Sequence, residues 1–273
     1  MSTTTPDHSA AVRALRKADP VLAGLIRSVG SCTMEIGGVQ SLFQALSRAI
    51  VYQQLSGKAA ATIHGRVCAL FPKSANGLKP ELLLTASDED LRGAGLSRAK
   101  TAALRDLAQK SVDGEIPTMA AVRKMTDDEI VENLIRVRGI GRWTVEMLLM
   151  FRLGRPDVLP ADDYGVRKGF AVTYGRRDLP TPKELLRHGE KWAPWRTVAS
   201  WYLWRAADKA TSEAKAATAS KSAAQTTGKP KATRKPATKP ATKPATKSAT
   251  KSTAKHTPAP KAVLKTNKGA KAS

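Results

Sequence analysis

Apolar residues recur at three- and four-residue spacing through most of the first 208 positions, a pattern typical of amphipathic helices. The spacing predicts two short helices within residues 7–29 that meet at Pro20, because a proline cannot continue the helix before it. It also predicts two longer helices within residues 39–70 that are joined near Leu55. We therefore expect helix to follow helix with short connections.

Two further helix starts are indicated by capping boxes. Ser87 and Thr126 each stand three residues before an acidic residue, so that each hydroxyl and each carboxylate can satisfy a free amide of the first turn. No segment alternates apolar and polar residues over the length of a useful strand. The fold class that the pattern predicts is all-α.

A predicted helix after Gly95 has a basic side. It carries Arg98, Lys100, Arg105 and Lys110 opposite its apolar residues. A solvated face is the simplest interpretation of these charges, and phosphate contact by Arg98 or Lys100 is the alternative.

The helical pattern is interrupted at Gly139-Ile140-Gly141. One apolar stretch ends at Val137 and another begins at Trp143, so that the sequence predicts a helix, a tight turn and a second helix. Two glycines one residue apart let the backbone turn sharply and approach a partner closely, and amides at a helix start suit a phosphate. An ordinary helix end followed by a connector would use the same glycines, so the motif alone leaves both interpretations open.

Composition divides the chain near residue 208. Residues 209–273 hold 16 of the 46 Lys and Arg but one of the 23 Asp and Glu, and so carry +15 of the net charge of +23. They lack a core-forming set of apolar residues and contain the near-repeat Lys-Pro-Ala-Thr, which predicts a disordered basic tail. Phosphate binding by counterion release is the function expected of the tail, and a solubilising segment is the alternative.

Several classes of protein are disfavoured. Cys32 and Cys68 cannot supply a four-thiolate cluster, and His64 and His188 have no ligand partners nearby in the sequence, so no metal site is expected. No run of 18 apolar residues and no hydrophobic leader is present. We expect a soluble protein without membrane partners, cytoplasmic and nucleoid-associated, or nuclear in a eukaryote.

Four separated segments carry a resemblance to a known family. Over residues 10–208 the chain resembles the helix-hairpin-helix (HhH-GPD) DNA glycosylase superfamily, and within it the bacterial 3-methyladenine DNA glycosylase II branch. The segments are Ile50-Val51-Tyr52-Gln53-Gln54-Leu55-Ser56, Gly141-Arg142-Trp143-Thr144, Asp162-Asp163-Tyr164 and Trp192-Ala193-Pro194-Trp195-Arg196. The resemblance implies a two-lobed helical glycosylase domain over residues 1–208, followed by the disordered tail over residues 209–273.

The resemblance selects Asp163 as the catalytic residue. Cleavage of an N-glycosidic bond passes through a cationic sugar, which a carboxylate can stabilise while it orients or deprotonates water. From the residues alone, Asp162 or Asp163 could instead cap the helix that begins at Tyr164, and Asp162 remains the minor alternative for the catalytic role. In relatives that also cut the DNA backbone, a lysine occupies the place of Trp143, so hydrolysis without a lyase step is expected.

The resemblance also implies a base pocket and a DNA-binding surface. Trp143 and Trp204 match positions that line the base pocket in this branch, and Met147, one turn from Trp143, is expected to close it. The DNA contacts are expected from the hairpin and from the joint between two earlier helices: Gly139, Ile140, Gly141, Arg142, Thr144, Gln53, Gln54 and Leu55.

The function that follows is monofunctional excision of alkylated purines from double-stranded DNA in base excision repair, by a monomer that extrudes the nucleotide. A non-catalytic helix-hairpin-helix DNA-binding or architectural protein is the alternative. No organic cofactor is expected, although hairpin carbonyls in this superfamily can hold a monovalent cation.

Overall fold

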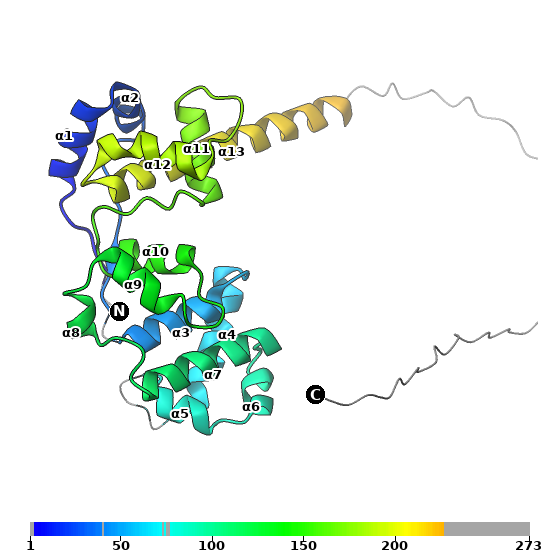
Figure 1. Cartoon of the computed structure of the whole chain (residues 1–273). Helices are drawn as coiled ribbons and strands as arrows, with labels where there is room; N and C mark the ends of the chain where they lie inside the picture. The colour runs from blue at the N-terminus through cyan, green and yellow to red at the C-terminus, as the bar shows by residue number, and fades with distance from the viewer. Residues whose placement is uncertain (1–2, 40, 73, 75–76, 227–273) are drawn as a thin grey trace, which may run out of the picture. The chain divides into compact units, whose positions relative to one another are not determined.

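The computed structural model describes residues 3–39, 41–72, 74 and 77–226, and these residues are mainly helical (Figure 1). In chain order the helices are α1 (Ser9–Ala18), α2 (Pro20–Val29), α3 (Leu42–Tyr52), α4 (Gly57–Ala69), α5 (Pro80–Thr85), α6 (Asp88–Gly93), α7 (Arg98–Val112), α8 (Met119–Val122), α9 (Asp127–Leu134), α10 (Arg142–Phe151), α11 (Tyr164–Thr173), α12 (Pro182–Gly189), the 3-10 turn η1 (Glu190–Trp192) and α13 (Arg196–Thr226). The predicted all-α class is confirmed. The strands in the described residues are β1 (Thr3–Thr4) and β2 (Ile36–Gly37), which form one antiparallel pair with Thr3 opposite Gly37.

Local capping signals fix several helix starts as predicted. Ser87 and Thr126 form complete capping boxes with Asp90 and Glu129, and so begin α6 and α9. A third box, Thr181 with Glu184, begins α12 and was not predicted. Most connections between the helices are short, and the longer ones follow α2, α4 and α10.

The described helices enclose two hydrophobic cores (Figure 1). The first core is built by α3 to α10 around fully buried residues such as Leu46, Leu104 and Leu134. The second core joins α1 and α2 to α11, α12, η1 and α13, so that the beginning and end of the folded chain pack together. Phe151 and Trp204 are partly buried against both cores and so connect them.

Close packing of α11 against α13 requires a glycine. A Cβ atom at Gly169 would overlap the backbone carbonyl of Leu203, which lies on α13. The two helix backbones can approach this closely because position 169 has no side chain.

Helix α13 continues beyond the domain boundary predicted at residue 208. It extends to Thr226, and Lys168 of α11 donates a hydrogen bond to the Thr211 hydroxyl at 2.8 Å. The helix continues because alanine and lysine favour helix, and the first proline after the boundary is Pro230. The part of the predicted tail from residue 227 onward lies outside the described residues.

None of the described helices is long and apolar enough to span a bilayer.

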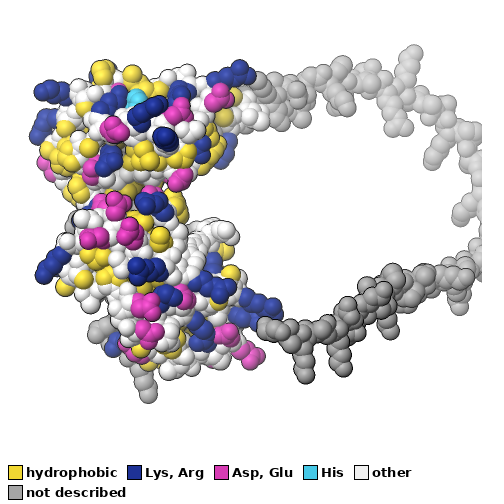
Figure 2. All heavy atoms as spheres, viewed as in Figure 1, with side chains coloured by type: hydrophobic (Ala, Val, Ile, Leu, Met, Phe, Trp, Pro, Cys, Tyr) yellow, Lys and Arg dark blue, Asp and Glu magenta, His cyan; other side chains and the backbone are white. Residues whose placement is uncertain are grey.

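The surface charges of the described residues are mixed in sign. Figure 2 shows Lys and Arg side chains interspersed with Asp and Glu on the face that it draws. Within the sequence, positive charge is concentrated after residue 208.

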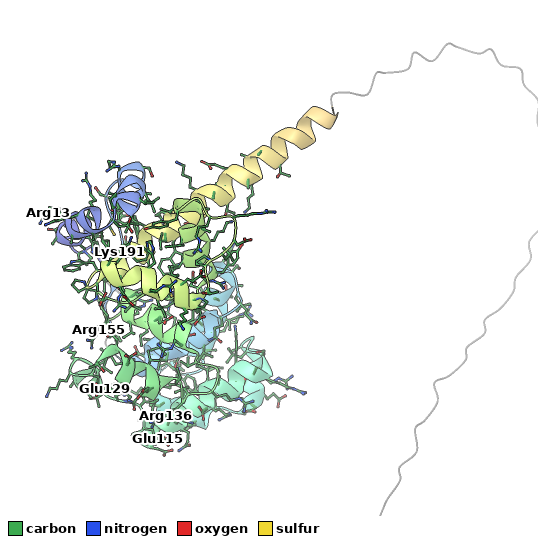
Figure 3. All side chains as sticks on the ribbon, turned by 45° about the horizontal axis from the view of Figure 1, so that its top comes forward. Arg13, Glu115, Glu129, Arg136, Arg155 and Lys191 are labelled. Atoms are coloured by element: carbon green, nitrogen blue, oxygen red, sulfur yellow. The ribbon has the colours of Figure 1, made fainter. Side chains whose placement is uncertain are left out.

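Asp19 is a buried acid whose hydrogen bonds connect the start of α2 to Tyr174 and Trp192 in the second core. Its Oδ1 accepts two amide hydrogen bonds and caps α2. Its Oδ2 accepts hydrogen bonds from the Tyr174 hydroxyl and the Trp192 indole, and it lies 3.0 Å from Nζ of Lys191, a residue labelled in Figure 3. Burial alone would raise the pKa of Asp19, but these donors outweigh burial and hold the pKa well below its ordinary value.

Replacing Asp19 by asparagine should destabilise the protein by about 3–5 kcal/mol at neutral pH, because the donors around it lose a buried charged acceptor. A depressed carboxyl pKa gives stability that is complete above the unfolded-state pKa of about 4 and is lost as the pH falls further. Urea unfolding of the wild-type protein and of Asp19→Asn should therefore show a difference in the free energy of unfolding that is large at pH 7 and shrinks below about pH 4. The exposed Asp178→Asn is the control, and an equal effect of the two substitutions would contradict the role of Asp19.

Candidate active site

The carboxylate of Asp163 accepts three hydrogen bonds at the start of α11. Its Oδ1 accepts from the amide of Val166 at 2.8 Å and from the indole Nε1 of Trp204 at 2.8 Å. Its Oδ2 accepts from the indole Nε1 of Trp143 at 2.7 Å. The sequence suggested a helix cap or a catalytic acid, and the structure shows that Asp163 is the cap and also the common acceptor of two tryptophans.

The neighbouring Asp162 is placed differently. Its side chain is exposed, whereas that of Asp163 is half-buried. The structure therefore brings Asp163, and not Asp162, into hydrogen-bond contact with the predicted pocket tryptophans.

The two tryptophans reach Asp163 from different cores. Trp143 lies in the first turn of α10 and leaves 48% of its surface exposed. Trp204 lies on α13 and packs against Phe151, with ring centroids 5.8 Å apart. A Cβ atom at Gly165 would lie 2.7 Å from the Trp204 ring, so the absence of a side chain at position 165 lets this indole reach the carboxylate.

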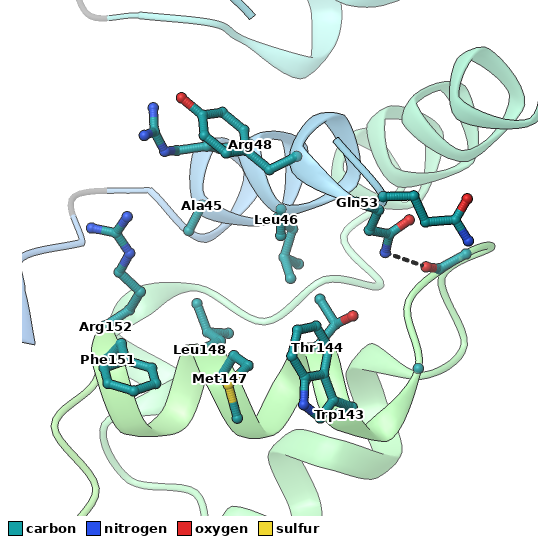
Figure 4. Close-up of a pocket in the computed structure, with 15 residues that line it drawn as sticks. Ala45, Leu46, Arg48, Gln53, Trp143, Thr144, Met147, Leu148, Phe151 and Arg152 are labelled. Carbon is teal, nitrogen blue, oxygen red and sulfur yellow. Dashed lines mark hydrogen bonds between the residues drawn. The ribbon is translucent and has the colours of Figure 1, made fainter. Parts of the chain in front are cut away.

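A cavity of about 600 Å³ opens beside Trp143, between α3 and α10 (Figure 4). Trp143 and Met147 line this cavity, whereas Trp204 is not among its lining residues within the described part of the chain. The described residues that line it are Ala45, Leu46, Arg48, Ala49, Tyr52, Gln53, Gln54, Gly139, Gly141, Trp143, Thr144, Met147, Leu148, Phe151 and Arg152. This mainly apolar wall with a few polar groups is typical of a small-molecule or base pocket.

The sequence did not single out Arg48 and Tyr52 as pocket residues. The Arg48 guanidinium lies over the Tyr52 ring at 4.1 Å from its centroid, an arrangement favoured by the four-residue spacing on α3. Tyr52 belongs to the segment that resembles the family, which was the signal available for it.

The hairpin between α9 and α10 has the predicted helix-turn-helix form. Gly139 has φ of +78°, in the left-handed region that glycine adopts without strain, whereas Gly141 is the extended N-cap of α10. Ile140 is buried beneath the turn. Arg142 is exposed, but the side chain of Thr144 is 9% exposed and forms part of the cavity wall.

The predicted DNA-facing joint between α3 and α4 contacts the hairpin. Gln53 Nε2 donates to the carbonyl oxygen of Gly139 at 2.9 Å, which Figure 4 marks with a dashed line. Gln54 has φ of +57°, a backbone conformation that is uncommon for a side-chain-bearing residue. Leu55 follows and is 40% exposed, although it is apolar. Gln53 thus joins two segments 86 residues apart in the sequence.

Glu146 is an acidic residue near the site that the sequence reasoning did not identify. It is 8% exposed on α10, and burial raises its pKa to about 7, while Arg142 opposes this shift and Asp162 and Asp163 add to it. A single acid within the apolar run from Val145 to Met150 was the sequence signal for it.

Within the described residues, no three His, Cys, Asp or Glu side chains come together as a metal site would require.

Proteins of known activity resemble this chain in sequence and structure. DNA-3-methyladenine glycosylase 1 of Schizosaccharomyces pombe is 40% identical over 165 residues, which cover 60% of this chain and 71% of that protein. The structure of the S. pombe 3-methyladenine DNA glycosylase in complex with abasic DNA matches with a TM-score of 0.62 and 35% identity, over 72% of this chain and 96% of that one. The structure of the DNA-3-methyladenine glycosidase of Bacillus halodurans matches with a TM-score of 0.67 and 37% identity, over 78% of this chain and 95% of that one.

The match to a family profile covers the segment that contains the hairpin and Asp163. Residues 47–194 match the family described as HhH-GPD superfamily base excision DNA repair protein. This segment includes α4 to α12 and most of α3, and so both the acid and most of the cavity wall. The chain therefore belongs to the HhH-GPD superfamily of base excision DNA repair proteins.

Proposed function

We propose that the protein is a monofunctional DNA glycosylase that excises alkylated purines from double-stranded DNA by hydrolysis. The observation that carries this proposal is the Asp163 carboxylate, held by two indole N–H groups beside an open, aromatic-lined cavity. The names of the similar proteins from S. pombe and B. halodurans support the same substrate class. Together the acid and the relatives support a base excision repair glycosylase over a non-catalytic DNA-binding protein.

The two carboxylate oxygens of Asp163 differ in how many further hydrogen bonds they can accept. Oδ1 accepts two hydrogen bonds, which occupy both of its lone pairs, whereas Oδ2 accepts one hydrogen bond among the described residues. Oδ2 is therefore the oxygen that can accept a proton from an attacking water.

Hydrolysis then follows from the geometry of the acid and the ring. The bond between C1′ and the base nitrogen breaks with its electron pair leaving on the base, and the carboxylate stabilises the positive charge that develops on the sugar. Water adds to C1′ and its proton passes to Oδ2 of Asp163. The exposed part of the Trp143 ring offers a face on which an extruded, electron-poor alkylated base can stack.

A monovalent cation at the hairpin is also part of the proposal, with the Gly139 carbonyl oxygen as one candidate ligand. The Gly139 carbonyl already accepts a hydrogen bond from Gln53, but a carbonyl oxygen has a second lone pair that can bind a cation.

Asp163→Asn should lower base excision by about 10²- to 10⁴-fold while DNA binding persists, because the substitution removes the charge that faces the developing cation. The measurement is single-turnover excision on a panel of duplexes, each with one 3-methyladenine, 7-methylguanine, hypoxanthine or ethenoadenine, followed by alkaline cleavage. Asp162→Asn is the matched control and should retain most of the activity, since its side chain is exposed. An inactive Asp162→Asn beside an active Asp163→Asn would show that Asp162 holds the catalytic role instead.

No covalent enzyme–DNA adduct should form when borohydride is added during turnover. Trp143 occupies the place of the lysine nucleophile, and its indole N–H is not a primary amine, so no imine can form there. Denaturing electrophoresis of labelled DNA would reveal an adduct, and a trapped adduct that depends on a lysine would overturn the monofunctional mechanism. Trp143→Lys should not create an efficient lyase, because the new amine would also need alignment and a lowered pKa.

Truncation after Thr226 should leave single-turnover excision at saturating enzyme nearly unchanged, because the cavity, hairpin and Asp163 all precede the cut. The removed segment contains 13 Lys and Arg and no acidic residue. Affinity for undamaged duplex should therefore fall, and the dependence of log K on log salt should become shallower by about 0.9 for each phosphate that the tail no longer neutralises. Equal salt slopes for the full chain and the truncated chain would show that the tail does not bind DNA.

A further inference from the structure

One helix of the first core, α7, holds the backbones of both segments that are expected to face DNA. Lys100 Nζ donates to the carbonyl oxygens of Val51 and Gln53 at 2.8 and 2.7 Å. Two turns further along α7, Asp106 Oδ2 accepts from the backbone amide of Arg138 at 2.7 Å. The first pair of contacts holds the joint after α3, and the second holds the hairpin.

The middle of the same side of α7 packs directly under the hairpin. Ala103 is buried, and a Cβ atom at Gly139 would lie 3.3 Å from the Ala103 Cβ. Lys100, Ala103 and Asp106 follow one another at three-residue spacing, which places them along one stripe of the helix. The Gln53 side chain also links the two segments directly, because it donates a hydrogen bond to the carbonyl oxygen of Gly139.

Lys100 does not belong to the solvated basic face that the sequence suggested for this helix. Burial lowers the pKa of Lys100, and both of its hydrogen bonds go to backbone carbonyls at the end of α3, where a cation is favoured by the helix dipole. Arg105 forms an ion pair with Asp88, and Lys110 forms one with Asp106. Arg98, at the start of α7, is exposed.

We propose that Lys100 and Asp106 are positioning residues that fix the spacing between the hairpin and the loop at Gln53-Gln54-Leu55. This inference rests on the proposed DNA glycosylase function. The hairpin and this loop are the two segments expected to contact DNA, so a fixed spacing between them would favour extrusion of the nucleotide. None of the hydrogen bonds of the Asp163 carboxylate goes to α7, so a change in this spacing is expected to affect extrusion more than the chemical step.

The test compares Lys100→Met with Lys183→Met, which makes the same substitution at an exposed position on α12 of the second core. Single-turnover excision is measured on a duplex with a paired lesion and on one whose lesion is an unpaired single-nucleotide bulge. Lys100→Met should slow excision of the paired lesion about tenfold or more, because misplacement by about 1 Å is costly. On the duplex with the bulged lesion, the excision rate should fall by less than about threefold, since an unpaired base costs less to extrude. Lys100→Arg, which keeps the donors, should restore most of the rate, and Lys183→Met should affect the excision of both lesions little.

Three results would overturn the proposal. Equal reductions on both substrates without rescue by arginine would show a general structural role for Lys100. A shallower salt dependence of binding to undamaged duplex, by about 0.9 in slope, would show that Lys100 contacts a phosphate instead. Unchanged rates would show that these hydrogen bonds do not matter for extrusion.

Asp106 provides a second test if Lys100→Met does not fold. Asp106→Ala removes the acceptor of the Arg138 amide and should produce the same selective reduction on the paired lesion, whereas Asp106→Asn keeps an acceptor and should be milder. Hydrogen exchange in the free protein separates this inference from the proposed function. The amides of Gln53 and Leu55 donate to the carbonyl oxygens of Ala49 and Tyr52. Faster exchange of these two amides in Lys100→Met would support the positioning role even if the wild-type chain excised no lesion, and unchanged exchange there would contradict it.

Discussion

The hydrogen bonds between Asp163 and the indoles of Trp143 and Trp204 are the interaction on which the proposed site depends. An indole has a single N–H donor, so one carboxylate that accepts from both rings determines where both rings point. Trp143 comes from a helix of the first core, and Trp204 and Asp163 come from the second. The acid therefore joins the two cores at the point where it is proposed to act.

Small residues make this arrangement possible. Gly169 lets α11 approach the backbone of α13, and Gly165 leaves the space that the Trp204 ring occupies next to Asp163. A methyl group at either position would meet atoms that belong to the backbone or to the ring itself. The placement of the acid is thus set by how closely two helices pack, in addition to the local cap that Asp163 forms.

The two cores have different tasks in the proposed mechanism. The first holds the hairpin, the joint after α3 and the cavity, and α7 ties the first two together through Lys100 and Asp106. The second holds the acid and is itself tied together by the buried Asp19. Changes in the first core are accordingly expected to affect DNA engagement, and changes around Asp163 the chemical step.

The sequence by itself determined the helical class, several helix starts and the hairpin turn at Gly139, because these depend on contacts between residues three or four positions apart. Through the resemblance to the HhH-GPD family it also singled out Asp163, Trp143, Met147 and Trp204. Only the tertiary structure decided that Trp204 binds the acid instead of lining the cavity, that Lys100 holds a loop instead of facing solvent, and that α13 passes residue 208. The physical reason is that a side chain's partner is chosen by packing between segments far apart in the chain. Helical periodicity shows which side of a helix is apolar, but it does not show which carbonyl or ring that side will meet.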